Sequence, residues 1–242
     1  MSESNRLGYP ELRRMAPEAL RMIGLPLGLA DRIADVLTWT EAATGRSLRA
    51  AARLDGQEQH VVLPDIHPAT EDPHHPVIDC AGASMLIFAP LIVDYLAAES
   101  HRGVYSATLR NYSDPSFLLY AAYQNSRAGY RLEISPAGHS SAQAQKFWES
   151  EELGEAPAYG QPELWVSITP PGHLARDAVS RFPGQILPEE SPLWGAVREA
   201  TVRVDEAKRT GIVVEDAELD WLRDITKRIR VKSSARSEMQ AG

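Results

Sequence analysis

Two helical segments joined by a short link constrain the fold of this 242-residue chain more than any other feature. Apolar residues recur at three- and four-residue spacing over residues 10–23 and again over residues 29–43, as in a helix with one buried face. Pro10 suits a first helical turn, and Gly24 and Gly45 suit helix ends. The pattern predicts an N-terminal helical hairpin, with a third, shorter helix over residues 47–54.

The middle of the chain has strand-like composition. We expect strands over residues 104–111, 117–125, 130–135 and 164–168, separated by turn sequences. The short apolar run at residues 85–88 is interpreted as a buried strand, followed by a helix that begins at Pro90. Consecutive strands joined in this way favour a mainly antiparallel central sheet.

The C-terminal third returns to helical spacing. A helix is expected from Pro192 to about Lys208, a short strand over residues 212–214, and a last helix capped by Asp216. The order of helices, strands and helices predicts an α+β fold. We expect one domain over residues 1–242, made of a helical part (1–56), a sheet-rich core (57–190), and C-terminal helices with a basic tail (191–242).

Composition restricts the partners. The net charge of −8 argues against nucleic acid, which needs a basic face. Cys80 is the only cysteine, so no intramolecular disulfide can form, and a reducing cytoplasm is the simplest location. The longest apolar stretch without charge, residues 80–93, is shorter than the roughly 20 residues that a spanning helix needs. No membrane association is therefore expected.

Residues 9–54, opening with Tyr9-Pro-Glu-Leu, resemble the N-terminal helices of the type 2 malate/L-lactate dehydrogenase superfamily. The tail from Val231-Lys-Ser-Ser to the closing Ala241-Gly242 is similar to that of a smaller, uncharacterised bacterial family of unknown function. Members of that family share the helix pair and a segment like residues 79–84. The resemblance implies a diverged, shortened relative of cytoplasmic enzymes that use NAD(P) and form homodimers.

One departure from the dehydrogenases concerns the chemistry itself. These enzymes carry a Ser-His-Gly catalytic motif after the second helix, and here the corresponding residues are Thr44-Gly-Arg-Ser47. No catalytic residue is carried over, and the sequence identifies no cofactor. The resemblance therefore supports the fold more than it supports hydride transfer.

Two segments are candidates for binding a small anion. His173 and Arg176 follow a predicted strand end in the segment 170–176, where a loop can form the rim of a carboxylate pocket. Ser234 and Arg236 belong to the basic run 227–236, which can hold a phosphate or carboxylate. The alternatives are a solvated turn and a helix end whose basic residues complement the helix dipole. His139 lies in a loop with a weaker case.

A metal site is the third candidate and is not favoured. His67, His74, His75, Asp79 and Cys80 are close in sequence but match no standard metal-binding spacing. A surface loop leading to a buried cysteine explains them better. Residues 79–84 could let a ligand approach the backbone, although close packing is the preferred interpretation. Cys80 as a nucleophile would need a nearby base and a lowered pKa.

The leading hypothesis is a protein that binds a small anionic metabolite such as a 2-oxo or 2-hydroxy acid, with conversion of that metabolite left open. The alternative is a non-catalytic subunit or assembly protein that retains a dehydrogenase-like fold and acts through a partner subunit.

Overall fold

The computed structural model describes residues 5–55, 65–67, 75–137, 141–149, 163–172 and 191–240. Their backbone forms an α+β protein of two units, as the sequence predicted for the fold class. Unit 1 comprises Met1–His60 and Val202–Gly242, and unit 2 comprises Val61–Thr201. Both ends of the chain therefore belong to one unit. The expectation that all 242 residues act as a single domain stays a prediction.

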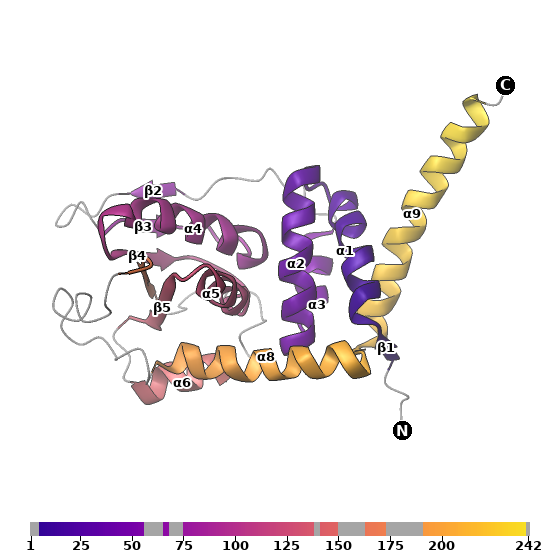
Figure 1. Ribbon diagram of the computed structural model, residues 1–242. Helices are drawn as coiled ribbons and strands as arrows, with labels where there is room; N and C mark the ends of the chain where they lie inside the picture. The colour runs from indigo at the N-terminus through magenta and orange to yellow at the C-terminus, as the bar shows by residue number, and fades with distance from the viewer. Residues whose placement is uncertain are drawn as a thin grey trace. The chain divides into compact units, whose positions relative to one another are not determined.

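Four helices lie wholly within unit 1 in the described part of the chain, and Figure 1 shows them side by side. They are α1 (Tyr9–Met22), α2 (Leu27–Thr44), α3 (Ser47–Leu54) and α9 (Asp216–Gln240). Helix α1 packs along α2, and α9 packs against α1 and α3. The apolar stripes meet in a core in which Leu12, Leu20 and Ile33 are fully buried. The predicted helical hairpin and third helix are confirmed.

A two-stranded sheet completes unit 1. Strand β1 (Asn5–Leu7) pairs antiparallel with β7 (Ile212–Val214), which brings the start of the chain against the segment after α8 (Pro192–Thr210). Gly211 links α8 to β7 with a φ of 86°, a conformation that glycine adopts without strain. Strand β7 was predicted from its Ile-Val-Val run, whereas β1 was not.

The sheet of unit 2 has the strand order β2-β3-β4-β6-β5. Its strands are β2 (Asp65–His67), β3 (Val77–Asp79), β4 (Tyr105–Arg110), β5 (Arg131–Pro136) and β6 (Leu164–Thr169). Among the described strands of this sheet, β3 and β4 pair in parallel, and the other three pairings are antiparallel. The expectation of a mainly antiparallel sheet is confirmed.

Helices cover this sheet. Helix α4 (Met85–Glu99), followed by the short helix η1 (Ser100–Arg102), connects the parallel strands β3 and β4, and it contacts β4 and β6. Helix α5 (Phe117–Arg127) packs beside α4 and contacts β5, and α6 (Ser141–Glu149) also contacts β5. The parallel β3–α4–β4 connection places the loops after β3 and β4 at the same sheet edge.

Two predicted strands are helices. Residues 85–88 form the first turn of α4, so Pro90 lies inside that helix rather than at its start. Residues 117–125 lie in α5. The side chains from Met85 to Pro90 are all buried. An element that is apolar on every side has no periodicity to separate helix from strand. For residues 85–88, a local contact favours the helix: Ser84 Oγ accepts a hydrogen bond from the Leu86 N–H at 3.2 Å and so caps the start of α4.

Candidate functional site

The predicted anion-binding residues lie largely beyond what the structure describes. His173, Arg176 and His139 fall outside the described residues. The backbone of Ser234 and Arg236 lies within α9, which continues through the basic run to Gln240, and their side chains are outside the description. Both proposed sites therefore stay predictions.

In the histidine and cysteine cluster, His75 has hydrogen-bond partners within the sheet and Cys80 is buried, while only the backbone of His67 is described, in β2. The two ring nitrogens of His75 lie 2.8 Å from Ser106 Oγ and 2.9 Å from Thr108 Oγ1, both on β4. Burial raises the pKa of the Cys80 thiol to about 12, which disfavours the reactive thiolate. His74 lies outside the described residues. Within the residues that are described, no group of three potential ligands is placed to hold a metal ion.

The turn at residues 79–84 is held by contacts with the loop after β4. Asp79 accepts hydrogen bonds from the Ala81 N–H at 2.9 Å, from Asn111 Nδ2 at 3.0 Å and from Arg110 Nε at 3.1 Å. The bond from Ala81 contributes most to lowering the pKa of Asp79. Ser84 Oγ donates to the buried Asp114 carboxylate at 2.6 Å. These contacts agree with close packing rather than an open ligand site.

The turn between α2 and α3, where the resemblance would place a catalytic histidine, is organised by Glu41. The Glu41 carbonyl accepts the Gly45 N–H at 2.8 Å, which ends α2, and Gly45 has a φ of 68°. The Glu41 side chain crosses to the next helix, where Oε2 accepts the Leu48 N–H at 2.8 Å and lies 2.9 Å from Ser47 Oγ. One residue therefore satisfies the end of α2 and the beginning of α3.

Glu41 is buried, with 1% of the residue exposed, and its Oε1 atom has no hydrogen-bond partner. Burial is the largest cause of a rise in the pKa of this carboxyl to about 7. The Leu48 N–H opposes the rise, and the carboxylate of Glu218 on α9 adds to it. Glu41 is thus a carboxyl group that changes its charge near neutral pH.

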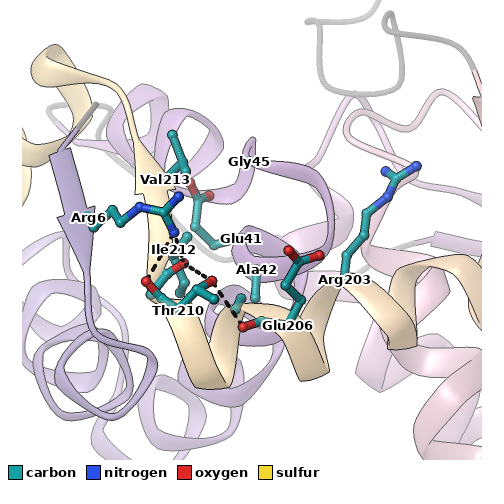
Figure 2. Close-up of a pocket in the computed structure, with 11 residues that line it drawn as sticks. Arg6, Glu41, Ala42, Gly45, Arg203, Glu206, Thr210, Ile212 and Val213 are labelled. Carbon is teal, nitrogen blue, oxygen red and sulfur yellow. Dashed lines mark hydrogen bonds between the residues drawn. The ribbon is translucent and has the colours of Figure 1, made fainter. Parts of the chain in front are cut away.

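A pocket of about 330 Å³ lies beside this turn within unit 1. Figure 2 shows it between the end of α2, the C-terminal half of α8, and the strands β1 and β7. Ionisable side chains make up much of its lining: Arg6, Glu41, Arg203 and Glu206. A cavity of this volume falls within the range of small-molecule sites, which begins at roughly 300 Å³.

The two arginines of this pocket come from distant parts of the chain. In Figure 2, Arg6 and Arg203 lie at opposite ends of the labelled residues, with Glu41 and Glu206 between them. Arg6 Nη1 donates to the Thr210 carbonyl at 3.0 Å, and Arg203 Nη1 donates to the Ala43 carbonyl at 3.4 Å. Each pocket arginine is therefore anchored to a backbone carbonyl of unit 1 by a hydrogen bond from its guanidinium.

Sequence reasoning missed this site because β1, α2 and α8 meet only in the folded chain. The sequence contained one indication of this site, which is the position of Glu41. Glu41 is spaced four residues after Leu37 and eight after Ile33, which places an acidic residue on the apolar stripe of the second helix. A charged residue on a buried helix face is unusual unless it is paired or functional.

The comparisons with known proteins define the fold. No family model matches the chain, and no curated protein matches it in sequence. Among solved structures, malate dehydrogenase from Pyrococcus horikoshii OT3 aligns over 95% of this chain and 97% of its own, with a TM-score of 0.59 and 14% identity. A putative malate/lactate dehydrogenase from E. coli aligns over 98% and 100%, with a TM-score of 0.56 and 12% identity.

Sulfolactate dehydrogenase from Methanocaldococcus jannaschii aligns over 93% of this chain and 97% of its own, with a TM-score of 0.52 and 13% identity. Across the part of the chain that is described, no helix is both long and apolar enough to cross a membrane. With such alignments over nearly the whole of both chains, the protein has the fold of the malate/lactate dehydrogenases, as the resemblance of its N-terminal helices predicted.

Proposed function

We propose that this protein binds a small anionic metabolite, such as a 2-oxo or 2-hydroxy acid, in the pocket of unit 1. The observation that carries the proposal is the presence of Arg6 and Arg203 on the lining of one pocket of about 330 Å³. Guanidinium groups bind carboxylates through paired, charge-assisted hydrogen bonds, which are stronger than bonds between neutral groups. A short organic acid matches both the charge and the size of this site.

The fold supports the same class of ligand. The similar structures are named for malate, lactate and sulfolactate, and each of these compounds is a small 2-hydroxy acid anion. The identities of 12–14% support the fold and leave the ligand to experiment. The substrate class is therefore part of this proposal.

Binding is better supported than hydride transfer. Reduction of a carbonyl needs a group that delivers a proton to its oxygen, and histidine is the commonest such group. The segment Thr44-Gly-Arg-Ser47 contains no imidazole, and its Gly45 forms the end of a helix. The described residues of the pocket lining likewise include no histidine.

Thermal unfolding in the presence of pyruvate, L-lactate or L-malate tests the proposal. A ligand that binds only the folded protein raises Tm. We expect a rise with the anions and none with lactamide, which keeps the shape of lactate without its charge. Replacing Arg203 with Gln should weaken binding by about tenfold or more, because a charge-assisted hydrogen bond contributes about 1.5–3 kcal/mol.

Arg14→Gln provides a matched control, since Arg14 is exposed on α1 and does not line the pocket. This variant should bind the anions like the wild-type protein. Arg6→Gln also removes the bond to the Thr210 carbonyl, so its stability must be measured without ligand first. An equal response of the Arg14 and Arg203 variants, or no response to any anion, would refute the proposed site.

The second candidate function is a non-catalytic subunit or assembly protein. The observation in its favour is that Thr44–Ser47 form a structural turn at the position where the resemblance implies a catalytic residue. Light scattering of the purified chain, alone and with co-purifying proteins, tests this function and the predicted homodimer. A mass of one chain under all conditions would count against both.

A further inference from the structure

The hydroxyl of Ser47 has two acceptors and a single proton. Ser47 Oγ lies 2.6 Å from the Leu37 carbonyl and 2.9 Å from Glu41 Oε2. A hydroxyl can donate only one of these bonds, and the bond to Leu37 is the shorter. The Ser47 hydroxyl therefore satisfies an ionised Glu41 Oε2 only in competition with the nearer Leu37 carbonyl.

The surroundings of Glu41 also favour its neutral form. From α9, Glu218 adds a buried carboxyl group whose Oε2 has no hydrogen-bond partner, and Glu215 lies immediately before that helix. From α3, Arg49 is the nearby cation, but it pairs with Glu215 at 2.7 Å and with Glu218 at 3.2 Å. Ionised Glu41 would therefore be a second buried negative charge beside Glu218, with its own Oε1 unpartnered.

The charge of Glu41 sets the net charge of the pocket lining. Arg6 and Arg203 supply two positive charges, and Glu206 supplies one negative charge. With Glu41 neutral, the described lining carries one net positive charge. When Glu41 ionises, the lining becomes neutral overall. An anion in the pocket thus meets an attractive field in only one of the two protonation states.

We propose that Glu41 is a proton-controlled regulator of the anion pocket: the pocket binds its ligand with Glu41 protonated and loses affinity when Glu41 releases its proton to solvent. This inference rests on the proposed function of the same site. Both carboxyl oxygens of Glu41 face the protein interior, so Glu41 does not contact the ligand directly. It acts through the electrostatic field in the pocket and through the α2–α3 turn. By linkage, binding of the anion near neutral pH takes up a proton.

The first experiment uses the wild-type chain and titration calorimetry with L-malate. Measurements in two buffers of different ionisation enthalpy, both at neutral pH, give the number of protons taken up on binding. We expect uptake of about half a proton per ligand, and a Kd about fivefold or more weaker at pH 8 than at pH 6. Zero uptake together with a constant Kd would overturn the inference.

Two substitutions identify the titrating group. Glu41→Gln, which keeps an oxygen for the Leu48 N–H, should remove both the proton uptake and the pH dependence of Kd. Glu18→Gln removes an exposed carboxyl of α1 outside the pocket and should retain both. Persistence of the pH dependence in the Glu41 variant would overturn the inference. Failure of L-malate, pyruvate and L-lactate to bind at any pH would instead overturn the proposed function itself, and this inference with it.

Discussion

The Oε2 atom of Glu41 accepts the backbone N–H of Leu48 at 2.8 Å, so a buried carboxyl of α2 caps the first turn of α3. Helix N-termini have backbone N–H groups without helical partners, and their positive end favours an ionised carboxylate. Burial nevertheless raises the pKa of Glu41 to about 7, because desolvation outweighs the hydrogen bonds to the carboxylate.

The first prediction is a fall in stability with rising pH. Between the unfolded pKa of 4.5 and the folded pKa of about 7, the folded state keeps a proton that the unfolded state releases. The free energy of unfolding therefore decreases as the pH rises through this window and levels off above it. The contribution of Glu41 is about 2–4 kcal/mol, measured as the difference in urea unfolding between pH 5 and pH 8.

Glu41→Gln isolates this contribution, because burial also raises the pKa of Glu133 and Glu218, and these groups add to the wild-type slope. The Gln variant should lose less stability than the wild-type protein between the two pH values. An identical loss in both proteins would show that Glu41 does not titrate in this window.

The sequence predicted unit 1 better than unit 2, and the reason is the solvent exposure of the helices. Helix α1 and the first half of α2 have an exposed side, so buried residues such as Leu12, Leu20 and Ile33 alternate with exposed ones at a helical spacing that can be seen in the sequence. Helix α4 is buried on nearly every side through its first turns, so its sequence shows no contrast between an apolar face and a polar face. The short strands β1 and β3 also lacked a signal, since three residues cannot establish an alternation.

The pocket could not be predicted for a different reason. Its charged residues Arg6, Glu41 and Arg203 meet through the pairing of β1 with β7, which joins opposite ends of the chain. Local sequence patterns contain no information about such a pairing, so only Glu41 was within reach of sequence reasoning. The predicted sites at His173 and Arg236 drew on local motifs and remain to be tested.

The second prediction concerns the core of the helical hairpin. Ile33 and Leu37 are fully buried on α2, and replacing either with Ala should lower the free energy of unfolding by about 2–5 kcal/mol. Leu27 begins the same helix and is 61% exposed, so Leu27→Ala should change stability by less than about 1 kcal/mol. Equal effects at Leu27 and Ile33, measured by urea unfolding, would be incompatible with this packing.

The third prediction concerns the ion pairs that join α3 to α9. Arg49 Nε lies 3.2 Å from Glu218 Oε1, and the Glu218 side chain is 5% exposed, so Arg49→Ala leaves a buried carboxylate without its cation. We expect a loss of about 1–3 kcal/mol in unfolding free energy. Lys227→Ala breaks an exposed pair with Asp224 and should cost less than about 1 kcal/mol. A smaller loss at Arg49 than at Lys227 would contradict the proposed role of burial.

The fourth prediction is that nicotinamide-dependent turnover is absent or weak. The turn at Thr44–Ser47 offers no histidine to protonate a carbonyl oxygen, and Glu41 Oε2 is engaged with Leu48 and Ser47. Steady-state oxidation of NADH and NADPH with pyruvate and other 2-oxo acids measures this. Robust turnover by the purified chain would mean that a proton donor lies elsewhere in the chain, and it would change the proposed function from binding to catalysis.

The fifth prediction separates the pocket from the basic tail as the site of anion binding. Truncation after Ile229 removes Ser234 and Arg236 but retains the contacts of α9 with Asp55, which Trp221 Nε1 meets at 3.1 Å and Arg228 Nη1 at 3.3 Å. We therefore expect the truncated chain to keep its Tm without ligand. If Arg6 and Arg203 bind the anion, the rise in Tm with L-malate should also be retained. Loss of that rise, with an unchanged Tm in the absence of ligand, would assign binding to the tail, where three serines and the charges of Arg230, Lys232 and Arg236 supply the donors.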